Sequence, residues 1–252
     1  MTSRIELIAL DGIGEVVEND DLAALIADAA TTSSIRLTDA DVVVVTQKIV
    51  SKAEGRLVEL ASVEPSDFAR DWASRWDRDP RQVELVLRES ASIVRMATGG
   101  LIISRTRHGL VCANAGVDVS NVAGGDVAAL LPEDPDASAR VIREGLRERA
   151  GAAPAVIISD SFGRSWRNGI VNVAIGSAGI EALLDLRGEP DASGRPMRAT
   201  IIAVADQLAS AADLAGGKVE QRPVVVVRGY AWRPSDVGAS VLVMEPERDL
   251  FP

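Results

Sequence analysis

The chain has 252 residues, of which 47% are apolar and 25% are charged, and its formal net charge at pH 7 is −10. This composition is typical of a folded globular protein with a sizeable core, and the length suits one large domain or two small ones. The acidic excess argues against nonspecific binding to nucleic acid or to anionic membranes, because no surplus of basic residues is present to neutralise phosphates.

The order of apolar and amphipathic segments predicts strands mixed with helices. Short runs rich in β-branched residues predict buried strands, and amphipathic stretches that begin with a capping Asp or Ser predict helices. In chain order we expect a strand at 5–10, a helix at 20–30, a strand at 42–45, helices at 66–76 and 81–90, closely spaced strands at 92–113, a helix at 136–150, strands at 155–158 and 200–204, a helix at 206–214 and a strand at 224–227. The turns at Gly99–Gly100 and His108–Gly109 indicate hairpins and break any strict alternation. The predicted fold class is therefore α+β, with a mixed β-sheet and flanking helices.

The whole chain, residues 1–252, is expected to form one interwoven catalytic unit. Proline and glycine gather at 131–135 and 187–196, but neither stretch is long or polar enough to be an interdomain linker. The turn at 132–135 is the place where two lobes could separate. The sequence shows neither the apolar region of a signal peptide nor an apolar stretch of membrane-spanning length, so we expect a cytoplasmic protein.

The single cysteine and the single histidine restrict the chemistry. Cys112 has no partner for an internal disulfide, and His108 alone excludes a site that needs two histidines, so zinc is disfavoured. A bound metal would need carboxylate, amide or hydroxyl ligands, which suit hard ions such as Mg²⁺ or Mn²⁺. We expect His108 to serve a turn and Cys112 to be a small buried hydrophobic residue.

Glycine-rich nucleotide motifs are incomplete in this sequence. Gly216–Gly217–Lys218 is followed by Val219 and lacks the upstream glycine of a phosphate-binding loop. Gly12–Ile13–Gly14 follows a predicted strand but lacks the third glycine of a dinucleotide fingerprint. A simple strand-exit turn and a turn that lets backbone N–H groups approach a phosphate are equally compatible with this spacing.

Polar residues follow two of the predicted buried strands. Residues 46–52, Thr-Gln-Lys-Ile-Val-Ser-Lys, come directly after the valine run, at a position where α/β proteins place ligand sites. The alternative is a solvated lysine loop, and the unbroken valine run slightly favours a site. After the strand at 155–158, Asp160 and Ser161 could ligate a hard divalent ion, while Arg164 and Arg167 could answer the charge of phosphate or carboxylate groups. The alternative is that Asp160 caps the next turn and pairs with Arg164.

Two further segments are candidates. Asp118 and Asn121 lie in a stretch of small residues at 113–121 and could share a site. Residues 205–213 begin a predicted helix whose N-terminus suits an anion. From spacing alone we favour the alternative, a tightly packed helix capped by Asp206.

Taken together, the segments resemble the coenzyme F-420:L-glutamate ligase family, also called F-420:γ-glutamyl ligase, over nearly the whole chain. The residues that carry the resemblance are 46–52 with Glu54–Gly55–Arg56, 107–111, 115–118, Ser120–Asn121, 131–139, 160–169 and 204–214. Some family members carry a C-terminal nitroreductase-like domain, and this chain is similar to the standalone form. The resemblance implies an interwoven two-lobed ligase fold.

The same resemblance implies a reaction and its cofactors. The expected activity is GTP-dependent addition of L-glutamate to the lactyl carboxylate of the deazaflavin coenzyme precursor through an acyl phosphate, followed by extension of a γ-linked tail. Mg²⁺ or Mn²⁺, two ions per site, K⁺ and a homodimer are also implied. The expected partners are small-molecule substrates, with neither nucleic acid nor membrane among them.

The resemblance also implies site residues, position by position. The implied metal ligands are Asp118 and Asp160 for one divalent ion and Ser161 and Gln207 for another. The implied nucleotide contacts are Ile13, Gly14, Glu15, Val16, Gln47, Lys52, Asn121, Ala205, Asp206 and Ser210. Lys52 would bind phosphate. From chemistry alone we add that Arg164 or Arg167 steadies the transferring phosphoryl group or the phosphodiester of the coenzyme.

Three positions depart from the pattern of the family. Gly14 stands where many relatives have Pro, Gln207 stands where many have Glu, and Val171–Asn172 stands where many have Thr-Asp. The departures keep two alternatives open. One is a ligase or phosphotransferase of the same scaffold that acts on another phosphorylated carboxylate. The other is a non-catalytic protein that binds a deazaflavin or a nucleotide.

Overall fold

The computed structural model describes residues 4–119 and 126–249. Its centre is a five-stranded sheet with the strand order β1 (Glu6–Ala9), β12 (Val224–Arg228), β2 (Val42–Thr46), β8 (Ala155–Arg164) and β9 (Arg167–Ala178). β2 and β8 run parallel, and the other neighbouring strands are antiparallel. The sheet is mixed, which confirms the predicted α+β class.

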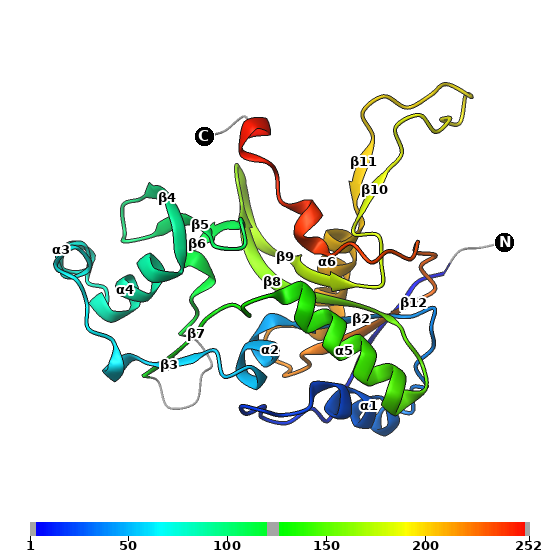
Figure 1. Ribbon diagram of the computed structural model, residues 1–252, viewed down its shortest axis with the longest axis horizontal. Coiled ribbons are helices and arrows are strands. Elements are labelled where there is room, and N and C mark those ends of the chain that lie inside the picture. The colour runs from blue at the N-terminus through cyan, green and yellow to red at the C-terminus, as the bar shows by residue number, and fades with distance from the viewer. Residues whose placement is uncertain (1–3, 120–125, 250–252) are drawn as a thin grey trace.

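Helices cover both faces of this sheet. On one face, α1 (Leu22–Thr32) and α5 (Pro135–Ala150) pack over Val43 and Val45, and on the other α6 (Val204–Gly216) packs over Val42 and Val44. Successive side chains of a strand point to opposite faces, so a strand covered on both faces must be apolar throughout. This explains the unbroken valine run. Figure 1 shows the helices on the two sides of the sheet.

Residues 57–119 and 126–129, here named the outer segment, lie beside the central sheet (Figure 1). Its elements are β3 (Leu57–Glu59), a 3₁₀ turn (Leu60–Ser62), α3 (Asp67–Trp76), α4 (Pro80–Glu89), β4 (Ser90–Met96), β5 (Ile102–Thr106), β6 (Val111–Ala113), a 3₁₀ turn (Asn114–Gly116) and β7 (Val127–Ala129). β4, β5 and β6 form the antiparallel sheet that the hairpin pattern predicts. β3 pairs with β7.

The remaining elements lie at the edges of the molecule. β10 (Leu183–Asp185) and β11 (Ile201–Ala203) pair with each other and carry an arm that projects from the body in Figure 1. Two 3₁₀ turns, Ala239–Leu242 and Pro246–Arg248, follow the last strand. Among the described residues, no helix is both long enough and apolar enough to cross a membrane.

The structure corrects three boundaries. Residues 47–53 form a helix, α2 (Gln47–Ala53), with Lys52 buried, so the solvated-loop interpretation is wrong. β8 does not end at Ile158 but continues to Arg164, because residues 159–164 pair with β9. The last helix begins at Val204, and Asp206 lies inside it and accepts a hydrogen bond from the Ala174 N–H, so it is not the cap.

Candidate functional site

Strand directions bring several chain segments to one edge of the central sheet. β1 and β2 are both antiparallel to β12, so their carboxyl ends lie at the same edge, where the last residue of β2, Thr46, pairs with Ser159 of the parallel strand β8. The turn at 11–16 follows β1, and α2 follows β2 at this edge. Ligand sites in open α/β sheets form at such strand ends.

Asp118 and Asp160 reach this edge from different parts of the fold. Asp118 belongs to the outer segment, where its backbone pairs with Ala129, and its carboxylate lies 2.7 Å from the Lys48 ammonium on α2. Asp160 lies on β8. Burial raises the pKa of Asp160 to about 6. The hydrogen bond from the Ser161 N–H opposes this rise, and the negative charge of Asp118 adds to it. The Lys218 and Lys48 ammonium groups oppose the rise, and a cation held between the two carboxylates would oppose it in the same way.

The donor set at Asp118 and Asp160 fits one hard divalent ion. Mg²⁺ is commonly bound by one or two carboxylates and completes its octahedron with water and substrate phosphate oxygens. Across residues 4–119 and 126–249, no group of three or more His, Cys, Asp or Glu side chains could hold a metal ion. For such an ion, the two carboxylates would be the charged protein ligands, and neutral groups, water or substrate would supply the others.

Ser161 belongs to a different polar cluster. Its hydroxyl donates to Asn172 Oδ1 at 2.7 Å and accepts from the Lys218 ammonium at 2.7 Å. Lys218 also lies 3.1 Å from Asp213 Oδ1. Gln207, the other residue expected to hold a second divalent ion, has an exposed side chain on α6. Ser161 is therefore in contact with the half-exposed Lys218 ammonium, as Asp118 is with the Lys48 ammonium, and the expected roles of Ser161 and Gln207 as metal ligands stay predictions.

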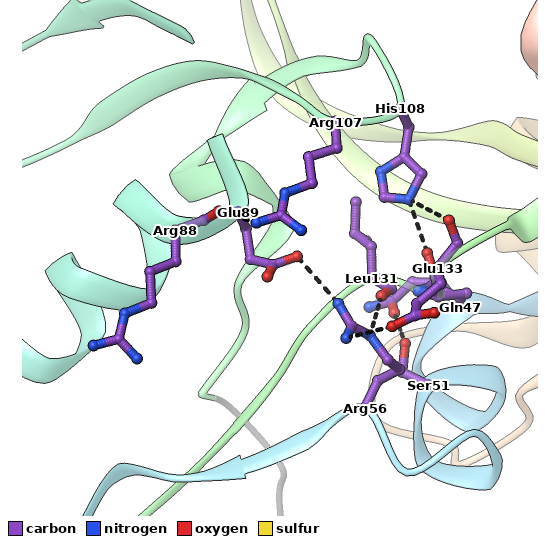
Figure 2. Close-up of polar contacts among 10 residues, drawn as sticks. Gln47, Ser51, Arg56, Arg88, Glu89, Arg107, His108, Leu131 and Glu133 are labelled. Carbon is purple, nitrogen blue, oxygen red and sulfur yellow. Dashed lines mark hydrogen bonds and ion pairs between the residues drawn. The ribbon is translucent and has the colours of Figure 1, made fainter. Parts of the chain in front are cut away.

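The expected nucleotide contacts at the end of β1 and on α2 are partly buried. Ile13 and Val16 are core residues, whereas Gly14 and Glu15 are exposed between them. Lys52 has a buried stem, and its ammonium lies 2.5 Å from Glu15 Oε1. Gln47 is buried and accepts from the Ser51 hydroxyl at 2.7 Å, as Figure 2 shows. The structure thus brings Glu15 and Lys52 together and turns Gln47 inward.

The expected contacts on α6 face the sheet. Ala205 is fully buried in the core. Asp206 accepts from the Ala174 N–H at 2.9 Å, and the Ser210 hydroxyl donates to the Asn172 carbonyl at 2.6 Å. These bonds attach α6 to β9. Asn121 lies outside the described residues.

The structure does not bring Arg164 and Arg167 to the carboxylates. Both are exposed at the tip of the β8–β9 hairpin, where Arg164 donates to the Asn168 carbonyl at 3.0 Å. Arg164 comes four positions after Asp160, which corresponds to roughly 13 Å along the strand. Trp166, between the two arginines, is 80% exposed. The alternative pairing of Arg164 with Asp160 is absent from the described ion pairs.

Arg56 joins the outer segment to the segment that enters α5 (Figure 2). Its guanidinium donates to the Leu131 carbonyl at 3.0 Å, to Glu89 at 3.1 Å and to Glu133 at 3.3 Å. At the β5–β6 turn, His108 Nε2 donates to the Pro132 carbonyl at 2.9 Å, so the predicted turn role of this histidine is confirmed.

Cys112 is buried on β6 and is a free thiol, as predicted. Burial raises the pKa of its thiol to about 12, and the nearby charge of Asp160 contributes to the rise. The thiolate is therefore disfavoured at neutral pH, which argues against a nucleophilic role.

The sequence patterns missed the roles of Lys48, Lys218 and Asp213. Lys218 occurs in a glycine-glycine-lysine run that fails as a phosphate-binding loop, and its partners Ser161 and Asn172 are far away in the sequence. One signal was available: the chain contains only three lysines, and all three contact site residues.

Fold and site together define an α+β protein with carboxylates and ammonium groups gathered at one sheet edge, an arrangement suited to divalent cations and phosphates. Residues 12–229 match the sequence model of the F420-0:gamma-glutamyl ligase family. The chain belongs to this family.

Curated relatives are similar over nearly the full length. The coenzyme F420:L-glutamate ligase of Methanothermobacter thermautotrophicus is 45% identical over 250 residues, which cover 98% of each chain. The enzyme of the same name from Methanopyrus kandleri is 45% identical and covers 99% of this chain and 98% of its own. The one from Methanocaldococcus jannaschii is 37% identical and covers 98% of this chain and 97% of its own.

Proposed function

We propose that this chain is a GTP-dependent ligase that adds L-glutamate to the lactyl carboxylate of the coenzyme F420 precursor and then extends a γ-linked glutamate tail. The observation that carries the proposal is the full-length similarity to curated relatives named coenzyme F420:L-glutamate ligase. The site supports it, because carboxylates for a divalent ion and ammonium groups for phosphates lie at one edge of the sheet.

The proposed reaction activates a poor acyl donor. A carboxylate oxygen of the precursor attacks the γ-phosphorus of GTP, the bond to the bridging oxygen breaks, and GDP leaves. The neutral amine of glutamate then attacks the acyl carbon, the bond to the phosphate oxygen breaks, and inorganic phosphate leaves while the amine nitrogen loses a proton. Positioning and charge neutralisation supply most of the catalysis in such transfers, so the protein needs no nucleophile.

The residues of the chain divide these tasks. Asp118 and Asp160 would hold Mg²⁺ or Mn²⁺, which when bound neutralises charge on phosphate oxygens. Lys52 would exchange Glu15 for a phosphate, since its buried stem keeps the ammonium at the end of β1. Three expectations stay predictions: the requirement for K⁺, the homodimer, and the roles of Arg164 and Arg167. Both arginines are exposed at the tip of the β8–β9 hairpin, which is far from Asp160 of the same chain.

The test is mass spectrometry of the precursor after incubation with the purified chain, L-glutamate, K⁺, Mn²⁺ and either GTP or ATP. We expect mass additions of glutamate with GTP that disappear with EDTA and in Asp160→Asn. Asp191→Asn, an exposed loop carboxylate that accepts from Ser193 and Arg195, is the matched control and should keep full turnover. Folded protein that adds no glutamate with either nucleotide would contradict the proposal. Additions that survive metal removal would contradict the assigned role of Asp160.

A further inference from the structure

Trp166, at the tip of the β8–β9 hairpin, differs from the other tryptophans of the chain. It is 80% exposed, whereas Trp72, Trp76 and Trp232 are half-buried. An indole buries a large apolar area when it packs, so an exposed one gives up most of the stabilisation that this residue type can supply. Trp166 therefore contributes little to the core.

The backbone at Trp166 is also unusual. Ser165 and Trp166 form the turn between Arg164 and Arg167, which pair across the hairpin. The φ angle of Trp166 is +58°, in the left-handed region that bulky residues rarely adopt. Asn or Gly would adopt this conformation with less strain. A strained residue whose side chain lies mostly in solvent indicates a role outside folding.

The two arginines that flank the turn give the hairpin tip a positive charge. Arg164 and Arg167 are both exposed, and Arg164 donates to the Asn168 carbonyl at 3.0 Å. Within residues 4–119 and 126–249, neither arginine forms an ion pair with a carboxylate. A guanidinium binds phosphate groups through paired N–H donors, and an indole stacks on planar rings. The tip therefore suits a ligand that carries both a flat aromatic ring and a phosphate.

The position of the tip relative to the carboxylates suits the length of such a ligand. Asp160 and Arg164 lie four positions apart on β8, so their side chains point to the same face of the strand, roughly 13 Å apart along it. In the coenzyme precursor, a phosphodiester lies between the reacting carboxylate and the aromatic ring. When the carboxylate reacts near Asp160, the ring must lie well away from it, and the hairpin tip lies at such a distance.

We propose that the hairpin tip binds the aromatic end of the precursor: Trp166 stacks on the deazaflavin ring, and Arg164 and Arg167 bind the phosphodiester. The inference rests on the proposed function for the identity of the substrate. It assigns Trp166 to recognition of the substrate and not to the chemical step. Loss of its ring should therefore raise the KM for the precursor and leave kcat nearly unchanged.

The test compares Trp166→Asn with the wild-type chain. Asn fits the left-handed backbone, so the variant should fold and be no less stable. In the glutamate-addition assay, the KM for the precursor should rise about tenfold, while kcat and the KM for GTP stay within about twofold. Titration of the precursor without nucleotide, followed by the fluorescence of its ring, should show the same loss of affinity. Phe68→Ala, which removes an exposed ring on α3, is the control and should leave both measurements unchanged.

A truncated substrate isolates the contribution of the ring. A lactyl phosphodiester without the deazaflavin ring should be used equally well by the wild-type chain and by Trp166→Asn, since stacking is then absent from both. A variant that uses this short substrate less well than the wild type would contradict a role for Trp166 in binding the ring. Trp166→Gly fits the same backbone and takes the place of Trp166→Asn if that variant does not fold.

The outcomes separate this inference from the proposed function. An unchanged KM and an unchanged affinity in folded Trp166→Asn would overturn the inference and leave the ligase intact. A lower kcat together with a changed oligomeric state, measured by light scattering, would also overturn it, because the tip would then be a contact between copies. A wild-type chain that binds the precursor through Trp166 but adds no glutamate would contradict the proposed function alone. A wild-type chain that neither binds nor modifies the precursor would overturn both.

Discussion

Asp41 is the most deeply buried carboxylate that the structure describes in an ion pair. It is fully buried at the start of β2 and receives two hydrogen bonds of 2.8 Å from the Arg228 guanidinium and one of 2.8 Å from the Thr38 N–H. Burial by itself would raise the pKa of Asp41, but these hydrogen bonds outweigh it, and the pKa lies below its ordinary value. The charged form of Asp41 therefore stabilises the fold.

We predict that Asp41→Asn lowers the free energy of unfolding at pH 7 by about 2 kcal/mol, since a charge-assisted pair is lost and Arg228 keeps an unmatched charge. A carboxylate whose pKa is lowered by folding stabilises the protein at pH values above its pKa in the unfolded chain, which is near 4. This stabilisation disappears as the pH falls through the pKa in the folded protein. The difference between wild type and variant should therefore shrink below pH 4. Urea unfolding at pH 7 and pH 3 measures it, with the exposed Asp28→Asn as a control. An unchanged difference at pH 3 would contradict the role of the ionised pair.

Single residues show where sequence reasoning stops. The types of residue at the site could be predicted, because Asp118, Asp160 and Lys52 stand in polar segments beside apolar strands. Their partners could not, since Lys218 meets Ser161 only after β8, β9 and α6 have packed. Asp206 illustrates the same limit. Its position in the sequence is typical of a helix cap, but its carboxylate accepts a hydrogen bond from the Ala174 N–H on β9.

At the scale of elements, local patterns predicted most helices and strands. The helices α1, α3, α4 and α5 are each capped by the Asp or Ser directly before them, a signal contained in a few residues. The error at β8 arose from nonlocal pairing. Residues 159–164 are mostly polar, and their hydrogen bonds to β9 make them a strand.

Close packing of α5 on β9 depends on a glycine that no pattern singled out. A Cβ at Gly176 would lie 2.3 Å from the Pro135 carbonyl oxygen, at the first turn of α5. Backbone cannot yield as a flexible side chain does, so the helix and the strand would have to separate.

We predict that Gly176→Ala destabilises the protein by about 2 kcal/mol through overpacking. Gly163→Ala is the matched control on the adjacent strand, where nothing lies within 4 Å of the added Cβ, and it should change stability by less than about 0.5 kcal/mol. Thermal unfolding of both variants measures the difference. Equal stabilities would show that α5 can shift without cost, contrary to the packing described here.

At the scale of the whole molecule, the site is shared between parts of the fold. Asp118 comes from the outer segment and Asp160 from the central sheet, so their separation depends on how firmly these parts are joined. Arg56 is one such joint, because it binds Glu89 of α4 and the Leu131 carbonyl together. The side chains of Arg56 and Glu89 are only 21% and 15% exposed, so water screens their pair weakly.

We expect loss of the Arg56 contacts to weaken metal binding at Asp118 and Asp160. We predict that Arg56→Met leaves Glu89 without its charge partner, lowers the free energy of unfolding by about 2 kcal/mol and weakens Mn²⁺ binding by about tenfold, because Asp118 loses its fixed distance from Asp160. Arg75→Met is the control on the same segment: Arg75 and its partner Asp71, one helical turn away on α3, are both more than half exposed, so their pair contributes little. Adding Glu89→Gln to Arg56→Met removes the unmatched charge and should recover part of the stability but not the Mn²⁺ affinity, since the joint stays broken. If Arg56→Met loses stability and keeps full Mn²⁺ affinity, the two carboxylates are positioned by their own strands, and the outer segment is held at the site by the Lys48 contact to Asp118.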